Sequence, residues 1–143
     1  MGKILCATRG GEGSDQTQDG AIALAKERGD ELHFLYVADV SFLSTTAAPL
    51  VVDVESRLEQ LGRFQLVVAQ ERAAAQGIVA QAIVRRGRLG PELVAAAKEL
   101  GATLIVLGRP LRQTAVFEDA TLQAFAAALQ AEIGVEVRIL ESE

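Results

Sequence analysis

Short apolar segments alternate with segments of helical periodicity along this chain. Five segments are rich in strand-forming residues, and they lie at 4–8, 31–38, 79–84, 103–107 and 135–140. Four segments place apolar residues at helical spacing, and they lie at 15–28, 51–76, 93–100 and 118–132. Because strand and helix alternate with short connections, we predict an α/β fold: a doubly wound, five-stranded parallel sheet with helices on both faces.

The composition is typical of a single domain spanning residues 1–143. Half of the residues are apolar and 4% are aromatic, so we expect a core of Ala, Val, Leu and Ile. Cys6 lies within an apolar strand, where a small core side chain is a more common role than a reactive thiol. One cysteine and one histidine do not make a structural zinc site, so we predict no metal.

Charge and hydropathy exclude two classes of partner. The net charge of −5 at pH 7 disfavours a nucleic-acid-binding protein, which usually needs a basic face. No segment approaches the roughly 18 uninterrupted apolar residues that a membrane span requires. The chain also enters its first strand directly, without a basic region, an apolar run and a cleavage site of the secretory kind. We therefore predict a cytoplasmic protein with no nucleic-acid and no membrane partner.

The first strand runs into a glycine-rich turn, Arg9-Gly-Gly-Glu-Gly-Ser14, and Ser14 suits the N-cap of the helix that follows. Helix N-termini in an open α/β sheet present unpaired N–H donors and the positive end of the helix dipole. Ligands bind in the crevice beyond the strand ends, where the strand order reverses. The turn is therefore the first place to look for a binding site.

Several short stretches of sequence carry information beyond the order of the strands and helices. Residues 4–14 read Ile-Leu-Cys-Ala-Thr-Arg-Gly-Gly-Glu-Gly-Ser, and residues 25–37 and 102–108 continue the pattern, with Gly87 and Pro91-Glu92 between them. Together these segments resemble the universal stress protein family: its opening strand and loop, its second strand, its third-strand exit and its fourth strand. The resemblance implies a sheet in strand order 3-2-1-4-5, a dimer, and a regulatory or protective role in stress physiology.

The resemblance also implies where a nucleotide would bind. Many family members hold ATP between the first and fourth strands, with a phosphate loop of the pattern G-2x-G-9x-G-[ST]. Gly108 matches the first glycine, but Leu111, Thr121 and Leu122 stand at the other three positions. Glycine lets backbone amides approach phosphate closely and adopts positive φ, whereas β-branched or bulky residues mostly do not.

Charges at this crevice depart from the family as well. The acidic residue that the family has after its first strand is Arg9 here, and Glu118 and Asp119 fall where the last helix should start. Carboxylates at that point interact favourably with the helix dipole and would repel a triphosphate. We therefore expect no bound cofactor. ATP or AMP held through a non-standard phosphate site is the alternative.

The candidate binding residues follow the ends of the first, second and fourth strands. They are Thr8, Arg9, Gly10, Gly11, Val37, Gly108, Arg109 and Arg112. Guanidinium groups are always charged and suit bidentate binding of phosphate or carboxylate, so one interpretation is a small-anion site. In the other interpretation the arginines close the crevice by pairing with carboxylates nearby, which are Glu12, Asp15, Glu118 and Asp119. The sequence leaves both open.

No arrangement for acid–base, nucleophilic or metal catalysis is visible, so we predict no enzyme and no catalytic residue. Ser14 has no histidine or lysine placed to activate it. The alternative is an enzyme of the nucleotide α-hydrolase-like group, which shares this sheet and splits ATP between its first two phosphates. Such an enzyme needs a glycine- and serine-rich phosphate loop after the first strand, which residues 10–14 resemble only distantly.

Two other polar features have structural interpretations. His33 lies in the middle of a strand with no acidic partner evident in the sequence, and we interpret it as a structural histidine. Arg85, Arg86 and Arg88 form a basic segment, which we interpret as a solvated turn. Neither feature adds to the predicted site.

The last strand predicts a homodimer. As an edge strand it would expose unpaired backbone donors and acceptors, which proteins usually cover. If two copies pair antiparallel about a two-fold axis near Val137, Glu136 of one copy lies opposite Arg138 of the other, twice. We therefore expect contacts through Val135, Glu136, Val137, Arg138 and Ile139. Taken together, the sequence predicts a non-catalytic, homodimeric regulatory or protective module with a degenerate nucleotide crevice.

Overall fold

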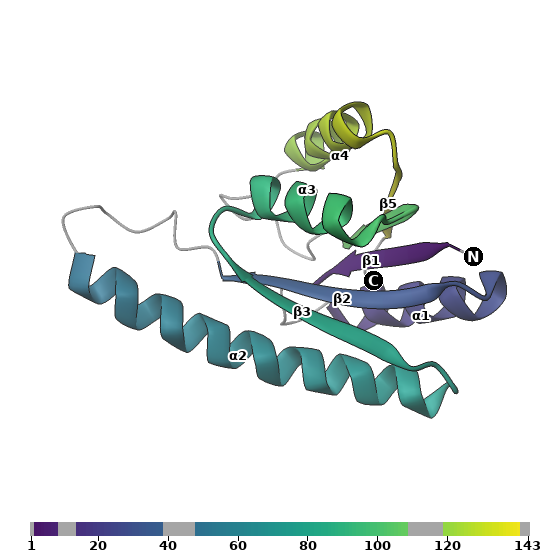
Figure 1. Cartoon of the computed structure of the whole chain (residues 1–143), viewed down its shortest axis with the longest axis horizontal. Coiled ribbons are helices and arrows are strands. Elements are labelled where there is room, and N and C mark those ends of the chain that lie inside the picture. Colours follow the sequence, from purple (N-terminus) through teal and green to yellow (C-terminus); the bar gives the residue numbers. More distant parts are fainter. Residues whose placement is uncertain (1, 9–13, 39–47, 109–118, 141–143) are drawn as a thin grey trace.

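The computed structural model describes residues 2–8, 14–38, 48–108 and 119–140 (Figure 1). Strands and helices alternate along it in the predicted order: β1 (Lys3–Ala7), α1 (Ser14–Arg28), β2 (Glu31–Ala38), α2 (Ala48–Ala75), β3 (Ala80–Arg86), α3 (Leu89–Leu100), β4 (Leu104–Gly108), α4 (Asp119–Ile133) and β5 (Glu136–Leu140). The bounds of β2 are those predicted from the sequence. The other elements begin and end within four residues of their predicted bounds.

The strands form one parallel sheet in the order β3-β2-β1-β4-β5. β1 lies at its centre, where Leu5 pairs with His33 of β2 on one side and with Ile105 of β4 on the other. The chain builds outward from β1 through β2 to β3, then crosses to β4, so the strand order reverses between β1 and β4. The predicted fold class and strand order are confirmed.

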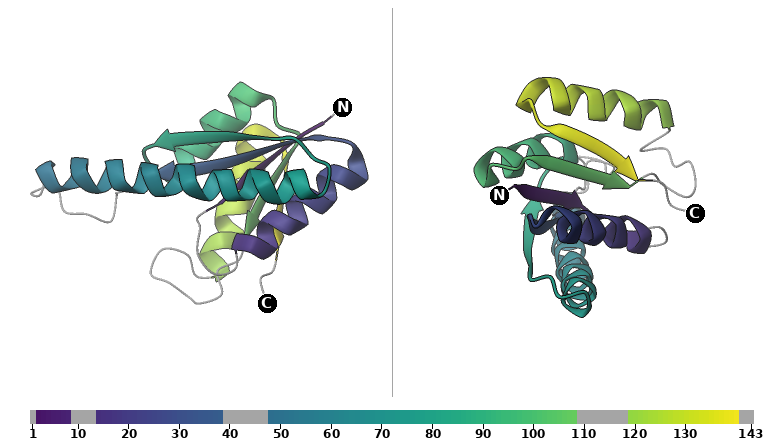
Figure 2. Two further views of the ribbon diagram at one scale, coloured as in Figure 1. Left: turned by 90° about the horizontal axis from the view of Figure 1, so that it is seen from below. Right: turned by 90° about the vertical axis from the view of Figure 1, so that its right-hand side faces the viewer.

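Helices cover both faces of the sheet, with α1 and α2 on one side and α3 and α4 on the other (Figure 2). Successive residues of a strand point to opposite faces, so Ile4 and Cys6 pack in the cluster under α1 and α2. Leu5, between them, packs in the cluster under α3 and α4. Most of the largest fully buried side chains are Leu and Ile, which confirms the predicted aliphatic core.

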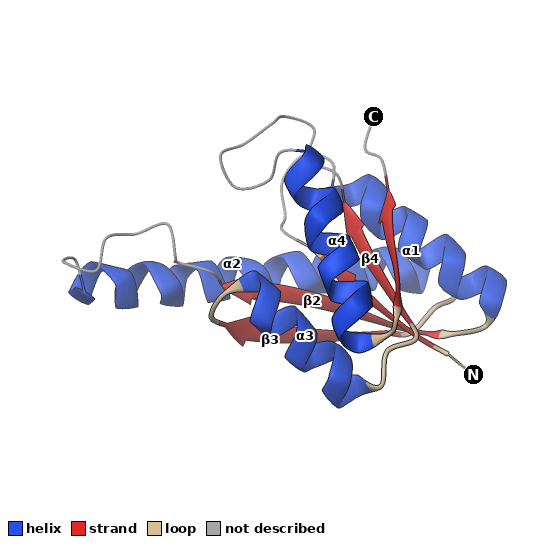
Figure 3. Cartoon of the chain, turned by 90° about the horizontal axis from the view of Figure 1, so that it is seen from above, coloured by secondary structure: helices blue, strands red, loops and turns tan. Residues whose placement is uncertain are grey.

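The helix α2 is 28 residues long and runs past the ends of β2 and β3 (Figure 3). Its backbone approaches the sheet closely at Gly62, where an added Cβ would lie 2.1 Å from Cδ1 of Tyr36. Tyr36 is 6% exposed, and this burial raises the pKa of its hydroxyl. Gly62 is therefore required by the ring of Tyr36, which occupies the space that any larger residue would need.

The third strand ends two residues later than predicted. Arg85 and Arg86 continue the ladder opposite Val37 and Ala38 of β2, where the sequence indicated a turn. The strand stops at Gly87, whose φ of +133° is a conformation that favours glycine. The two arginines are thus strand residues with fixed directions, and the interpretation as a solvated turn is wrong for them.

The helix α3 begins at Leu89, four residues before its predicted start. Pro91 is therefore its third residue. N–H groups in the first turn of a helix have no partner within it, so proline removes no hydrogen bond there. At the other end Gly101 adopts φ +73° and donates its N–H to the carbonyl groups of Ala97 and Lys98.

Candidate functional site

The ends of β1 and β4 lie side by side where the strand order reverses. Cys6 pairs with Val106, so Thr8 and Gly108, each two residues further on, come to the same level of the neighbouring strands. Gly108 is itself paired with Leu140 of β5. The structure thus brings together the two strand exits that border the predicted crevice.

Thr8 is buried and turned toward α1. Its N–H donates to the carbonyl oxygen of Leu35 at 2.8 Å, and its Oγ1 accepts a hydrogen bond from Nε2 of Gln18 at 3.1 Å. Thr8 and Gln18 are 5% and 2% exposed. The threonine hydroxyl is therefore held by the helix that follows the glycine-rich turn.

Gln18 is a residue of this site that the sequence analysis missed. Its Oε1 atom is buried and has no hydrogen-bond partner in the described part of the chain. An unpaired buried acceptor costs about 1–3 kcal/mol, so this oxygen is an available acceptor next to the strand ends. The signal was present: Gln18 precedes the buried residues Ile22 and Ala25 by four and seven positions, so it stands in the apolar stripe of α1.

Val37 lies on the other face of the sheet from Thr8. It is half-buried and packs against the cluster under α3 and α4. The other candidates of the first and fourth strand exits lie outside the described residues, and these are Arg9, Gly10, Gly11, Arg109 and Arg112. The same holds for Glu12 and Glu118 and for the side chains of Asp15 and Asp119. The anion site and its alternative, closure by internal ion pairs, both stay predictions.

The helix α4 starts at the point where the family's phosphate loop would end. Asp119 is its first residue, so Thr121 and Leu122 fall in its first turn. The sequence predicted the helix start one residue earlier, at Glu118. The two residues that replace a glycine and a serine or threonine are thus part of the helix N-terminus, the position where backbone N–H groups would face a phosphate.

Arg85 and Arg86 are held by carboxylates of the flanking helices. Arg85 donates from Nε to Oε1 of Glu92 at 2.8 Å and from Nη1 to Oε2 of Glu99 at 2.6 Å, both on α3. Glu92 first, and then Glu99, keep the pKa of the Arg85 guanidinium above its ordinary value. Arg86 donates to Glu59 of α2, on the opposite face of the sheet. These ion pairs fasten the edge strand to both helical layers.

Glu59 accepts from two arginines. Besides Arg86, the Nη2 of Arg63 donates to its Oε1 at 2.7 Å. The hydrogen bond from Arg63, followed by the one from Arg86, keeps the pKa of the Glu59 carboxyl below its usual range. Such a pair of charge-assisted bonds indicates a structural carboxylate and not a general base, which would need a raised pKa.

His33 has an acidic neighbour on its own strand, which corrects the expectation from the sequence. Its Nε2 lies 3.6 Å from Oε2 of Glu31, and the same carboxylate lies 3.9 Å from Nζ of Lys3. Residues two apart on a strand point to the same side, so Glu31 and His33 meet there. His33 pairs with Leu5, three residues before Thr8, so it lies away from the strand exits.

Three further observations concern the cysteine thiol, metal binding and membrane crossing. Cys6 is fully buried and free, and burial raises the pKa of its thiol to about 12, which confirms its prediction as a core residue. Within the described residues, no group of three or more His, Cys, Asp or Glu side chains comes close enough to hold a metal ion. In the same part of the chain, no helix has both the length and the hydropathy that crossing a membrane needs.

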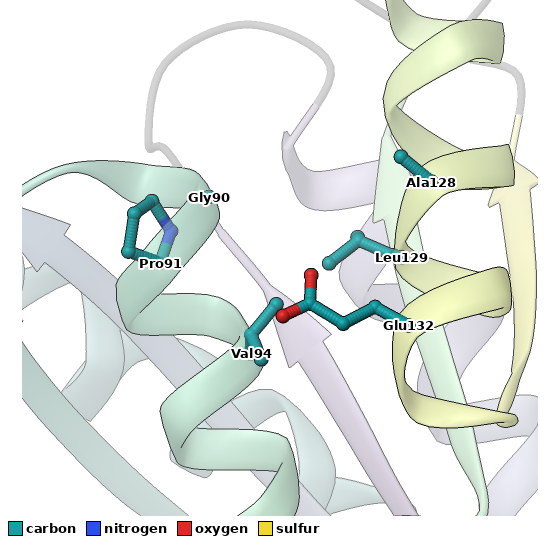
Figure 4. A pocket seen from close by; sticks show the side chains of 6 residues that line it. All are labelled: Gly90, Pro91, Val94, Ala128, Leu129 and Glu132. Atoms are coloured by element: carbon teal, nitrogen blue, oxygen red, sulfur yellow. The ribbon is translucent and has the colours of Figure 1, made fainter.

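An open pocket of about 400 Å³ lies between α3 and α4, and none of the described residues that line it is a predicted site residue. Its lining residues are Gly90, Pro91, Val94, Ala128, Leu129 and Glu132. Figure 4 shows the side chain of Glu132 reaching from α4 toward Val94 of α3. The wall is apolar except for this one carboxylate, so the pocket lacks the convergent polar groups that fix a ligand's orientation.

Comparison with known proteins gives concordant results. The model of the universal stress protein family matches residues 1–116. Universal stress protein YxiE of Bacillus subtilis is 32% identical over 114 residues, which cover 74% of this chain and 77% of that protein. The structure of universal stress protein UspA from Lactobacillus plantarum matches with a TM-score of 0.80 at 15% identity, over 97% of each chain. A universal stress protein family structure from Arabidopsis thaliana, with AMP bound, matches with a TM-score of 0.65 at 11% identity, over 100% of this chain and 93% of that one.

The fold is thus a doubly wound α/β sheet with its strand order reversing between β1 and β4, and it matches the fold of these solved structures. The chain belongs to the universal stress protein family. This confirms the resemblance drawn from residues 4–14, 25–37 and 102–108. The family match ends at residue 116, before α4 and β5.

Proposed function

We propose that this universal stress protein is a non-catalytic regulatory or protective module of the cytoplasm, active as a homodimer, whose crevice holds a small anion instead of ATP. The observation that carries the proposal is the start of α4. Its first turn contains Thr121 and Leu122 where the ATP-binding pattern has a glycine followed by serine or threonine, and its first residue is Asp119. A carboxylate and two side chains at a helix N-terminus oppose a polyphosphate that must approach backbone N–H groups closely.

The absence of catalysis is supported by what surrounds the described strand exits. The hydroxyl of Thr8 accepts from an amide, Gln18, and not from a general base. His33 lies toward the opposite end of the strands, next to Glu31. The thiol of Cys6 has a pKa of about 12 and is fully buried, so it is not a nucleophile at neutral pH.

A small anion suits the chemistry that the sequence gives to this crevice. Arg9 follows Thr8, and Arg109 follows Gly108, at two strand exits that lie at the same level. The helix α1 begins at Ser14, so its unpaired N–H groups and its positive dipole end come directly after the glycine-rich turn. Phosphate is the simplest ligand for guanidinium groups combined with backbone donors.

The homodimer is proposed through β5. Val137 and Ile139 pack inward beneath α3 and α4. Glu136 and Arg138 point to the other face, where Nε of Arg138 lies 2.5 Å from Oε2 of Glu136 in the same chain. In an antiparallel pair of β5 strands centred on Val137, Glu136 of each copy would pair with Arg138 of the other copy instead of with Arg138 of its own chain. The strands would keep their geometry.

Calorimetry with inorganic phosphate, AMP and ATP tests the crevice. We expect phosphate to bind, and we expect binding to be lost in Arg9→Ala but kept in the matched control Arg28→Ala at the far end of α1. ATP should bind no more tightly than phosphate. Micromolar ATP binding that disappears in Gly108→Val would overturn the proposal, because it would show a working phosphate loop after β4. Turnover of ATP to AMP would establish the enzyme alternative.

AMP is the second candidate ligand, held through a non-standard phosphate site. The observation that favours it is the fold match to the Arabidopsis thaliana protein, whose structure has AMP bound. A monophosphate places one phosphate in the crevice and needs no loop around a polyphosphate tail. Micromolar binding of AMP together with weak binding of ATP would select this ligand over free phosphate.

A further inference from the structure

The helix α2 has two faces of opposite character. Toward the sheet, Leu66 and Ala73 are almost fully buried. On the outer side, Leu61, Phe64 and Val67 are 49%, 64% and 51% exposed. At 3.6 residues per turn, Leu61 and Val67 lie about 60° to either side of Phe64. Phe64 therefore marks the middle of an apolar stripe that points away from the sheet.

The residues around this stripe are self-complementary. Leu61 and Val67 are each three residues from Phe64, and Arg57 and Glu71 are each seven residues from it, two full turns along the same side of the helix. Arg57 and Glu71 are both exposed. We call these five residues the Phe64 face. An arrangement that is symmetric about its centre, with opposite charges at its two ends, is what a two-fold contact between identical surfaces requires.

We propose that the Phe64 face is a self-association surface, on which α2 of a second copy packs antiparallel about a two-fold axis at Phe64. Leu61 then lies opposite Val67 of the second copy, and Arg57 lies opposite its Glu71. Each contact occurs twice. A parallel pair would instead place Arg57 against Arg57 and Glu71 against Glu71, so the charges select the antiparallel arrangement.

The length and composition of the face suit such a contact. The span from Arg57 to Glu71 is about 21 Å at 1.5 Å per residue, the range over which two helices stay in contact. Single exposed apolar residues are ordinary on a protein surface, but three within two turns of one helix form a contiguous patch. Arg57 already has an interaction within its own chain, and its five N–H donors leave room for a second carboxylate.

This contact would not compete with the proposed β5 contact. The helix α2 packs on β2 and β3, whereas β5 forms the opposite edge of the sheet (Figure 2). Two different two-fold contacts on one chain join copies into a closed tetramer or an open chain. One helix pair buries less than the roughly 1,200 Å² of a standard interface, so the contact is a weak one that depends on protein concentration.

Sedimentation of the full chain over a wide concentration series tests the proposal. The variant Arg138→Glu serves as the background, so that the β5 contact is weakened in every protein compared. We expect Phe64→Gln in this background to raise the dissociation constant about tenfold or more, as for an aromatic at the centre of an interface. The matched control Val79→Ser changes a residue that is 85% exposed but lies outside the Phe64 face, and it should change nothing.

A charge exchange gives the sharper result. Arg57→Glu alone and Glu71→Arg alone should each raise the dissociation constant by roughly threefold to tenfold, because each creates two like-charge contacts. The double variant Arg57→Glu/Glu71→Arg restores opposite charges and should associate like its parent. A mixture of the two single variants should associate more strongly than either alone, because only the mixed pair is complementary.

Circular dichroism of every variant shows whether the fold is kept, and the substituted side chains are exposed, so we expect it to be. A background protein that stays monomeric at all concentrations would overturn the proposal. So would association that Phe64→Gln leaves unchanged, or a double variant that is no better than the single variants.

Discussion

The two edges of the sheet carry the same residue types and use them differently. On β3, Arg85 donates to Glu92 and Glu99 of α3, and Arg86 donates to Glu59 of α2. On β5, the ion pair of Arg138 is with Glu136 of the same strand. The arginines of β3 thus tie their strand to helices on both faces, whereas the charges of β5 stay on their own strand.

Charged residues on an edge strand can therefore serve two different purposes. Edge strands leave backbone donors and acceptors unpaired, and a protein covers them or blunts them. At β3, partly buried ion pairs anchor the strand to the helices on both faces. The charged residues of this edge therefore contribute to the stability of the domain. At β5 the opposite charges at positions 136 and 138 form a repeat that a second copy can match. Substitutions can separate these two roles.

The largest effect is expected at the β3 side, where α2 meets the sheet. Gly62→Ala places a Cβ 2.1 Å from Cδ1 of Tyr36, and overpacking of this kind costs up to about 3 kcal/mol. We expect a loss of that size in the free energy of unfolding, measured in urea by circular dichroism. The control Gln65→Ala, one turn along α2, should change it by less than about 0.5 kcal/mol. Since alanine favours helix over glycine by about 1 kcal/mol, a stabilised Gly62→Ala would mean that the close approach is absent.

The ion pairs of β3 come next. Arg85→Met removes two carboxylate contacts from a side chain that is 26% exposed. We expect the free energy of unfolding to fall by about 1–2 kcal/mol, less at high salt, because the pairs are partly screened by solvent. Arg88→Met is the matched control: Arg88 is exposed and makes no side-chain hydrogen bond to the α3 N-terminus that it caps. Equal losses in both variants would contradict the role given to Arg85.

At the β5 edge the expected effect is on association and not on folding. Arg138→Glu, made in a Phe64→Gln chain in which the α2 contact is already weakened, should raise the dissociation constant of the dimer up to about tenfold. The stability of the monomer should stay the same. Glu136→Arg/Arg138→Glu, which exchanges the two charges, should restore the dimer. Sedimentation that shows an unchanged dimer in the single variant would rule out pairing centred on Val137.

The smallest effect is the dependence of the β3 edge on pH. The folded-state pKa of Glu59 is below its ordinary value, so its contribution to stability is complete above the unfolded-state pKa and is lost as the pH falls through the folded-state pKa. Glu59→Gln should therefore lower the melting temperature at pH 7, and the difference should disappear in acid. In an Arg63→Gln/Arg86→Gln chain, the same substitution should make little difference at either pH. A difference that does not change with pH would contradict this assignment.

The comparison of edges also shows which parts of the fold the sequence could predict. The strand β2 was predicted to the residue, because residues 32–37 are rich in strand formers and lie between Gly29 and a polar segment. The end of β3 was not. Two successive arginines indicate an exposed turn when only neighbouring residues are considered. The carboxylates that bind Arg85 and Arg86, however, lie 7 to 27 positions away in the sequence.

The candidate site could likewise be predicted only where the signal is local in the sequence. Thr8 and Gly108 were placed correctly at neighbouring strand exits, because an apolar strand followed by a polar or glycine turn is a local pattern. Gln18 was missed, since its position in the apolar stripe of α1 becomes informative once Thr8 is known to face that helix. The glutamate beside His33 stands two residues earlier on the same strand, and the period of a strand is enough to predict that the two side chains meet.

The position of Cys6 has a practical consequence. It is the one cysteine of the chain, and it lies fully buried on the central strand, flanked by Phe34 and Val106. A thiol reagent reaches it when β1 separates from its neighbours, so the rate of labelling in native buffer reports how often the middle of the sheet opens. The protein thus carries its own reporter residue for spontaneous opening, and the measurement needs neither denaturant nor an introduced cysteine.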